Sequence, residues 1–201
     1  MAYDAAVSEP LVPPRIVEIV LTGGSCAGKT ESLDRLATML RHDGHRVITV
    51  PEVATMIIKG GGQDIGDIAR EDGDAYCRFQ REVFLTHRGL RESARAMAAN
   101  VGSEAVATAV VVILYDRGEL DGVAYHNHDC FDQLAAQEGT TVAAIRDSYD
   151  AIMHLVTTAD GAEDFYTKAN NSARWDNAQE ARYFDAKVLR AWSGHPPSGG
   201  A

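Results

Sequence analysis

Gly23-Gly24-Ser25-Cys26-Ala27-Gly28-Lys29-Thr30 is the stretch of this 201-residue chain that decides its fold. It fits the pattern G-x-x-x-x-G-K-[ST] and stands between an apolar run at residues 16–21 and a helical pattern, the context that the pattern requires. Backbone N–H groups of such a loop point at phosphate oxygens, and the start of the following helix adds partial positive charge. The stretch therefore predicts a loop that binds the phosphates of a nucleoside triphosphate; the alternative is an ordinary glycine-rich turn.

The residue types in the loop predict what each part of it contacts. The ammonium group of Lys29 is expected to reach the β- and γ-phosphates, and the Thr30 hydroxyl is expected to hold Mg²⁺. The loop does not distinguish ATP from GTP. We expect every residue of the loop to contact the nucleotide, namely Gly23, Gly24, Ser25, Cys26, Ala27, Gly28, Lys29 and Thr30.

Composition excludes several classes of partner. The net charge of −10 argues against a general surface for nucleic acid or for an anionic membrane. No stretch approaches the roughly 18 apolar residues of a membrane span. The three cysteines, Cys26, Cys77 and Cys130, lack the paired spacing of a disulfide framework or a zinc ribbon. A reducing, cytoplasmic setting is therefore expected.

Strand and helix patterns alternate along the chain. Apolar runs predict strands at residues 16–21, 46–50, 109–115 and 152–156, and helical spacing predicts helices from about 29 to 44, at 53–58, at 74–99 and at 177–192. Gly60-Gly61-Gly62 is expected to break the second helix, and Met97 is expected on the inward face of the third. The alternation predicts an α/β fold with a mostly parallel sheet. Together with the phosphate loop it predicts a three-layer α/β/α, kinase-like P-loop NTPase.

One domain is expected at residues 15–192, between a flexible leader at 1–14 and a flexible tail at 193–201. P-loop kinase sheets normally have five parallel strands, whereas the sequence has four strand patterns. We therefore expect the final strand to be missing, so that the chain is either a fragment truncated in its tail or a naturally shortened protein.

Two neighbouring residues follow the buried strand at 109–115. Asp116 is expected to hold Mg²⁺, directly or through water, as the second half of a nucleotide site; the alternative is a helix N-cap. Arg117 carries a planar fork that suits a phosphate or the charge on a transferring group, and the alternative is a solvated surface arginine. Both residues are candidate catalytic groups, together with Lys29.

Glu52 stands at the carboxyl end of the strand at 46–50, where open α/β sheets bind their ligands. Its carboxylate is a candidate to accept the proton of a hydroxyl that attacks the γ-phosphate. Coordination of Mg²⁺ through water, or capping of the next helix, are the alternatives.

Cationic side chains follow the fourth strand pattern. Lys168 and Arg174 lie in the polar stretch 159–174, and Arg182 lies on the next helix. A lid that closes over phosphates and excludes water would use such a composition, and Arg174 is expected to contact the nucleotide. The alternative is a charged, exposed loop, which the acidic residues of the same stretch favour.

Three segments in combination resemble one known family. They are Thr22 to Thr30, Val50-Pro51-Glu52-Val53-Ala54-Thr55 and Asp116-Arg117-Gly118-Glu119-Leu120-Asp121. The combination resembles the P-loop AAA-type domain shared by the NadR nicotinamide-riboside kinase and the TRPL translocation defect proteins. Later segments, such as Ala191-Trp192-Ser193-Gly194-His195-Pro196, make it more similar to the second group. The resemblance covers about residues 15–196.

The resemblance implies a fold like that of small-molecule kinases, which binds ATP or GTP with Mg²⁺. Lys29, Thr30 and Asp116 match the family's phosphate-loop and strand-end positions, and Glu52 and Arg117 match further motif positions. Two functions follow. One is phosphate transfer to an unidentified small hydroxyl-bearing acceptor. The other is a GTP-binding regulatory module read by a partner, for which the translocation defect group implies phosphoinositide binding.

Overall fold

A four-stranded parallel sheet with strand order β2-β3-β1-β4 is the centre of the computed structural model, which describes residues 14–61, 72–100, 110–125, 128–161 and 177–196. The strands are β1 (Arg15–Thr22), β2 (Arg46–Val50), β3 (Val110–Asp116) and β4 (Ala151–His154). All three strand pairs are parallel, and Leu21 of β1 is in register with Asp116 of β3. The carboxyl ends of β1 and β3 therefore lie together at one edge of the sheet.

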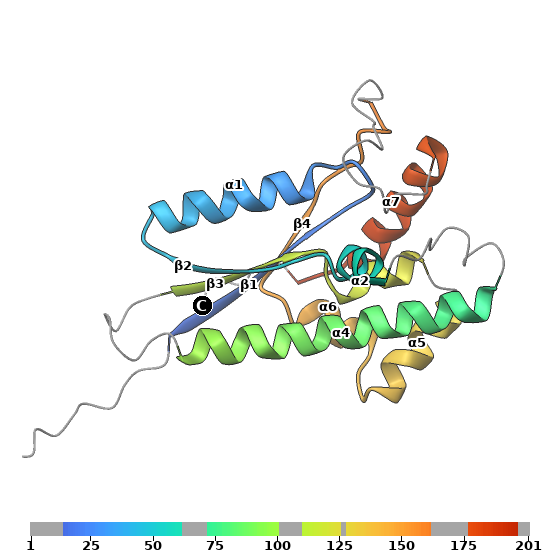
Figure 1. Cartoon of the computed structure of the whole chain (residues 1–201), viewed down its shortest axis with the longest axis horizontal. Coiled ribbons are helices and arrows are strands. Elements are labelled where there is room, and N and C mark those ends of the chain that lie inside the picture. The colour runs from blue at the N-terminus through green and yellow to red at the C-terminus, as the bar shows by residue number, and fades with distance from the viewer. Residues whose placement is uncertain (1–13, 62–71, 101–109, 126–127, 162–176, 197–201) are drawn as a thin grey trace, which may run out of the picture.

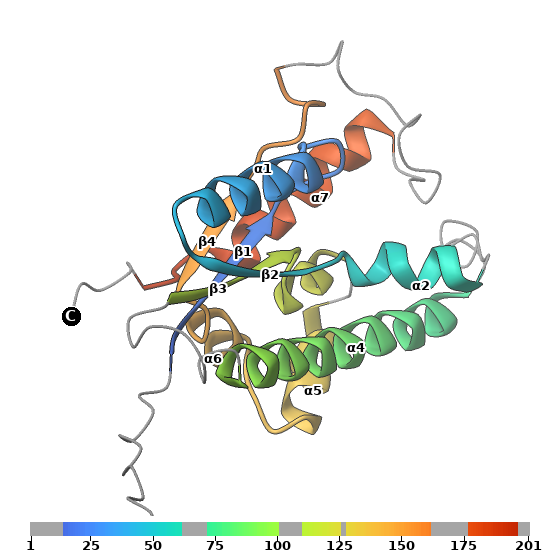
Figure 2. The same ribbon diagram turned by 60° about the vertical axis from the view of Figure 1, so that its left-hand side comes forward.

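Helices cover both faces of this sheet, and Figures 1 and 2 show α1 and α4 on opposite sides of it. Leu33 and Ala37 of α1 (Lys29–His42) pack against Leu114 on one face. Phe84 and Ala94 of α4 (Gly73–Asn100) belong to a larger core on the other. The predicted three-layer α/β/α fold with a parallel sheet is confirmed.

Shorter helices complete the layer around α4. They are α2 (Val53–Gly61), the 3-10 helix η1 (Glu119–Ala124), α5 (His128–Gln137) and α6 (Val142–Asp147). The last helix, α7 (Ala178–Trp192), packs on η1 and places Val188 and Trp192 in the larger core. None of the described helices is long and apolar enough to cross a bilayer.

The predicted elements agree with the structure except at a few positions. The four predicted strands and the four predicted helices exist, but η1, α5 and α6 were not predicted, and β4 is a short strand that ends at His154 instead of Val156. The expected break at the triple glycine is wrong for its first two residues, because α2 continues through Gly60 to Gly61. A glycine weakens a helix by only about 1 kcal/mol, and the last turn tolerates it.

Met97 is the second correction, because its side chain is 53% exposed instead of facing inward. The buried face of α4 carries polar residues that alternate with apolar ones, and it includes Gln80, His87 and Arg91. Arg91 donates to both carboxylate oxygens of Glu18 on β1, at 2.9 and 3.2 Å. Long-range partners of this kind allow polar residues to share the inward face of α4 with apolar residues such as Phe84 and Ala94.

Several predictions concern residues outside the described part of the chain. These are most of the leader at 1–14, the end of the tail at 193–201, Gly62, Lys168 and Arg174.

Candidate functional site

The loop between β1 and α1 has the backbone of a phosphate-binding loop. Cys26 and Gly28 have φ angles of 56° and 71°, and Gly23 has a φ of 131°. Successive N–H groups of residues near left-handed and right-handed helical conformations converge on one concave side, which suits an anion. Gly28 is also the N-cap of α1, so the positive end of the helix faces the same concavity.

Lys29 is folded back over this loop. Its ammonium group donates to the carbonyl oxygens of Gly24 at 2.6 Å and of Gly23 at 3.1 Å. The side chain is buried, and burial together with the charge of Arg117 lowers its pKa to about 8. A buried cation that is hydrogen-bonded to two carbonyl groups can exchange them for phosphate oxygens.

Thr30 and Asp116 join the loop to the end of β3. The Thr30 hydroxyl donates to one Asp116 carboxylate oxygen at 2.7 Å. The second oxygen, Oδ1, is buried and has no hydrogen-bond partner among the described residues. Burial raises the pKa of Asp116, and the Thr30 hydrogen bond opposes that rise only in part. The carboxylate therefore lies in the cavity beside the phosphate loop with one oxygen available to a ligand.

Glu52 and Arg117 connect the ends of β2 and β3. Arg117 Nε lies 2.5 Å from Glu52 Oε1, and the Thr55 hydroxyl donates to the other oxygen at 2.7 Å. Burial alone would raise the pKa of Glu52, but the charges of Arg117 and Lys29 outweigh it and lower the pKa to about 2. Glu52 is therefore an ionised, fixed carboxylate at any pH near neutrality.

Arg117 also contacts the phosphate loop itself. Its Nη1 donates to the Gly23 carbonyl at 3.0 Å and to Asp121 at 3.1 Å. The residue has a φ of 72°, which is uncommon for an arginine. His87 Nε2 lies 3.1 Å from the Arg117 carbonyl, and since a carbonyl only accepts, this nitrogen carries the proton. Arg117 is thus held by both its backbone and its guanidinium.

Asp121 and Asp185 form hydrogen bonds that support the site, and neither was predicted to do so. Asp121 accepts from the Thr22 hydroxyl at 2.8 Å and from the Trp192 indole at 3.1 Å. Asp185 of α7 accepts from the Gly24 N–H at 2.6 Å. These contacts tie the phosphate loop to the last helix, which is more than 150 residues further along the chain.

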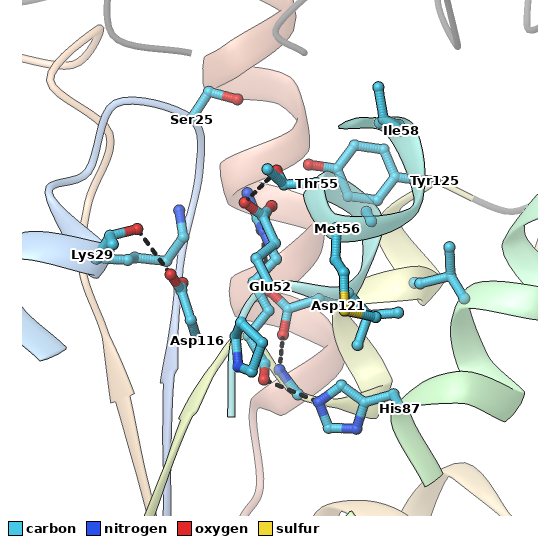
Figure 3. Close-up of a pocket in the computed structure, with 18 of the residues that line it drawn as sticks. Ser25, Lys29, Glu52, Thr55, Met56, Ile58, His87, Asp116, Asp121 and Tyr125 are labelled. Carbon is cyan, nitrogen blue, oxygen red and sulfur yellow. Dashed lines mark hydrogen bonds and ion pairs between the residues drawn. The ribbon is translucent and has the colours of Figure 1, made fainter. Parts of the chain in front are cut away.

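One cavity of about 660 Å³ opens from the phosphate loop and continues between α2 and α4. Figure 3 shows Lys29 and Asp116 on one side of it, Met56 and Tyr125 on the other, and Glu52 between them. The deeper wall is formed by residues of α4: Tyr76, Phe79, Gln80, Val83, Phe84 and His87.

The described candidate residues therefore come together as a single site. The loop from Ser25 to Thr30 lines the cavity with Glu52, Asp116 and Arg117. Gly23 and Gly24 lie behind it and accept from Lys29. Arg182 is elsewhere, donating to the Ala159 carbonyl at 2.5 Å, so it anchors the segment after β4.

The fold and this loop define the class of the protein, a P-loop nucleotide-binding protein of the NTPase type. A family model for the AAA domain matches residues 18–198, nearly the whole chain, and the protein belongs to that family. A search of curated proteins finds no significant match.

Proposed function

We propose that the protein is a Mg²⁺-dependent kinase that transfers the γ-phosphate of ATP or GTP to a small hydroxyl-bearing acceptor. The observation that carries the proposal is the continuous cavity, which has the phosphate loop and Asp116 at one end and a compartment between α2 and α4 at the other. Glu52 stands at the junction. A protein that only binds nucleotide does not need this second compartment.

Thr30 and Asp116 fit a divalent cation. The free, buried Asp116 Oδ1 is a hard oxygen donor beside the Thr30 hydroxyl, and such oxygens are what Mg²⁺ takes in proteins. When bound, Mg²⁺ would polarise phosphate oxygens and offset their charge. The raised pKa of Asp116 is the expected signature of a buried carboxylate whose counter-ion arrives with the substrate.

Different residues of the chain contribute to the proposed transfer of the γ-phosphate. Lys29 binds phosphate oxygens and Arg117 adds positive charge beside the loop, which stabilises charge on the moving group. Glu52 accepts a hydrogen bond from the acceptor hydroxyl and aims its oxygen at the γ-phosphorus. A new O–P bond forms, the bond to the leaving nucleoside diphosphate breaks, and the hydroxyl proton leaves to a carboxylate or to water.

Glu52 acts mainly by orientation in this scheme. A carboxylate with a pKa of about 2 is a weak base, but a loose phosphoryl-transfer transition state needs little proton removal before the O–P bond forms. The separate positions of Glu52 and Asp116 around the loop support the proposed roles of an orienting group and a metal ligand.

The resemblance to the NadR and TRPL groups supports two different activities. The first group supports a kinase; the second supports a GTP-binding regulatory module linked to a partner or a phosphoinositide. The acceptor compartment favours the kinase. The phosphate contact predicted for Arg174 belongs to this proposal as a further cation at the nucleotide.

Nucleotide binding and transfer can be measured separately. We expect ATP or GTP to raise the melting temperature, and to raise it further with Mg²⁺ present, because ligands that bind the folded state stabilise it. Transfer is measured as labelled γ-phosphate on a hydroxyl compound. Nucleotide binding without transfer to any acceptor would favour the regulatory module, and no stabilisation by any nucleotide would contradict the site itself.

A further inference from the structure

The acceptor compartment has charges that disfavour an anion. Glu52, Asp116, Glu119 and Asp121 all line the cavity, and the three last are buried. Glu52 and Asp121 pair with Arg117, and Glu119 pairs with Arg91 at 3.1 Å. The carboxylates therefore already occupy the neighbouring cations, and an anionic acceptor with its hydroxyl beside Glu52 would have to displace them.

The cations that line the cavity are engaged elsewhere or lie at its margin. Arg117 is bound to Glu52, Asp121 and the Gly23 carbonyl. Lys29 faces the phosphate loop. Lys59 is exposed in the last turn of α2. Among the described lining residues, there is therefore no buried arginine or lysine that is held ready for the phosphate or carboxylate of an acceptor.

Aromatic side chains form the walls instead, and neighbours hold two of them in place. The Phe84 ring packs edge-on against Phe131, with centroids 5.5 Å apart. The Tyr125 ring stacks on Phe184 at 4.8 Å. Aromatic side chains that neighbouring rings already hold in place lose little conformational entropy when a flat ligand binds. Such walls favour ligands with rings over ligands with flexible chains.

Gln80 and His87 are both buried polar side chains on the α4 wall. His87 Nε2 contacts the Arg117 carbonyl, whereas the Gln80 carboxamide, 6% exposed, opposes the rise that burial causes in the pKa of the Tyr76 hydroxyl. A carboxamide has two N–H donors and two acceptor lone pairs, so one contact with Tyr76 leaves capacity for a donor–acceptor edge on a ligand. A ligand that leaves this buried amide without a hydrogen-bond partner would bind more weakly, and Gln80 would therefore discriminate between ligands.

We propose that the acceptor is an uncharged hydroxyl compound with a flat, largely apolar body, and that Gln80 reads its polar edge. The inference rests on the proposed function and names the substrate class of the same site. It excludes compounds that already carry a phosphate, including phosphoinositides and nucleoside monophosphates.

In the test, the protein is assayed with pairs of acceptors that differ only by a phosphate. Nucleosides, pentoses and inositol are each assayed beside their phosphate monoester, with Mg²⁺ and labelled ATP or GTP, and vesicles containing phosphatidylinositol phosphate are a further arm. We expect transfer to uncharged members that contain a ring with amide-like groups, and at least tenfold lower kcat/KM for their monoesters. Equal or faster transfer to a monoester or to the vesicles would overturn the inference and leave the kinase intact. No transfer to any member, with nucleotide binding retained, would overturn the proposed function itself.

Gln80→Leu tests the residue assignment with the accepted compound. We expect KM for the acceptor to rise about tenfold or more, with nucleotide affinity and melting temperature close to those of the wild type. Gln80→Glu, which keeps the shape but changes the donors, should have the same effect on KM. Gln133→Leu, at an exposed position of α5 that does not line the cavity, is the matched control and should leave acceptor KM unchanged. An unchanged KM in both Gln80 variants, or an equal rise in Gln133→Leu, would contradict the role of Gln80.

Discussion

Arg117 Nε lies 2.5 Å from Glu52 Oε1 and so joins the residue that follows β3 to a residue just after β2. The same guanidinium reaches the Gly23 carbonyl of the phosphate loop. The acceptor end of the cavity and the nucleotide end are thus connected through one side chain. The ion pair keeps Glu52 ionised and immobile, which suits a group that orients a hydroxyl.

Glu52→Gln should separate transfer from binding. The amide keeps the shape of the side chain but loses the charge that pairs with Arg117. We expect kcat to fall by roughly 100-fold or more, while nucleotide affinity changes less than about threefold. Steady-state kinetics and calorimetry measure the two effects. Glu92→Gln, at an exposed position of α4, is the matched control. Unchanged kcat in Glu52→Gln would show that the carboxylate has no part in transfer.

Glu52 should also contribute to stability in a pH-dependent manner. Its folded-state pKa of about 2 lies below the ordinary value of 4.5, so the folded state binds fewer protons than the unfolded state between these values. Its contribution is present above about pH 5 and is lost as the pH falls toward 2. The loss is on the order of 2–3 kcal/mol. Urea denaturation from pH 7 to 3 should give a shallower acid loss for Glu52→Gln than for the wild type; parallel curves would contradict the ion pair.

Lys29 should make nucleotide binding depend on pH on the alkaline side. Its pKa of about 8 in the free protein will rise when phosphates surround it, so binding takes up a fraction of a proton at pH 8–9.5. Titration of Lys29 should leave the nucleotide affinity constant below about pH 7.5 and should make it fall as the pH rises beyond 8. Calorimetry in two buffers of different ionisation enthalpy measures the proton uptake. Lys29→Arg stays charged and should show none.

Much of this site could be predicted because the phosphate loop, Glu52 and Asp116 all lie at or shortly after the carboxyl end of a strand. The carboxyl ends of parallel strands meet at one edge, so the strand pattern alone places Glu52 and Asp116 beside the loop. Asp185 and Thr157 could not be predicted in this way, because their partners, the Gly24 N–H and the Ser25 carbonyl, are distant in sequence. Gln80 could not be predicted either, since a single polar residue on a helix gives no indication of which ligand it will meet.

Met97 of α4 was predicted wrongly, because it fits an apolar stripe but its side chain is 53% exposed. Arg91 is buried on the same helix because Glu18, Glu119 and Ser148 supply its hydrogen bonds. Periodicity measures hydrophobicity, and it ranks a buried, fully paired arginine as a surface residue.

Asp116→Asn should separate stability from metal dependence. The pKa of the carboxyl group is raised in the folded state, so its ionised form destabilises the apo protein. The stability of the apo protein therefore falls as the pH rises through that pKa. We expect Asp116→Asn to melt at the same temperature as the wild type or higher, and to lose the extra stabilisation that Mg²⁺ gives with nucleotide. Thermal melts with nucleotide, with and without Mg²⁺, measure both. A variant that keeps the Mg²⁺ effect would place the metal elsewhere.

Gly24→Ala should show that the last helix holds the phosphate loop. A methyl group at Gly24 would lie 2.8 Å from Cβ and 2.9 Å from Oδ1 of Asp185, and 3.0 Å from Cβ of Thr157. Two of these atoms are beta carbons, which cannot move without the backbone, so α7 or the loop must shift. Such overpacking destabilises by about 1–3 kcal/mol, and the displaced loop should bind nucleotide at least tenfold more weakly.

Gly60→Ala is the matched control for that variant, because a methyl group there meets nothing within 4 Å and lies in the last turn of α2. It should leave nucleotide affinity unchanged and stabilise the protein by up to about 1 kcal/mol, since alanine favours a helix over glycine. Chemical denaturation and calorimetry on the two variants compare the positions directly. If Gly24→Ala were as stable as Gly60→Ala and bound nucleotide equally well, the hydrogen bond from the Gly24 N–H to Asp185 would not hold α7 against the loop.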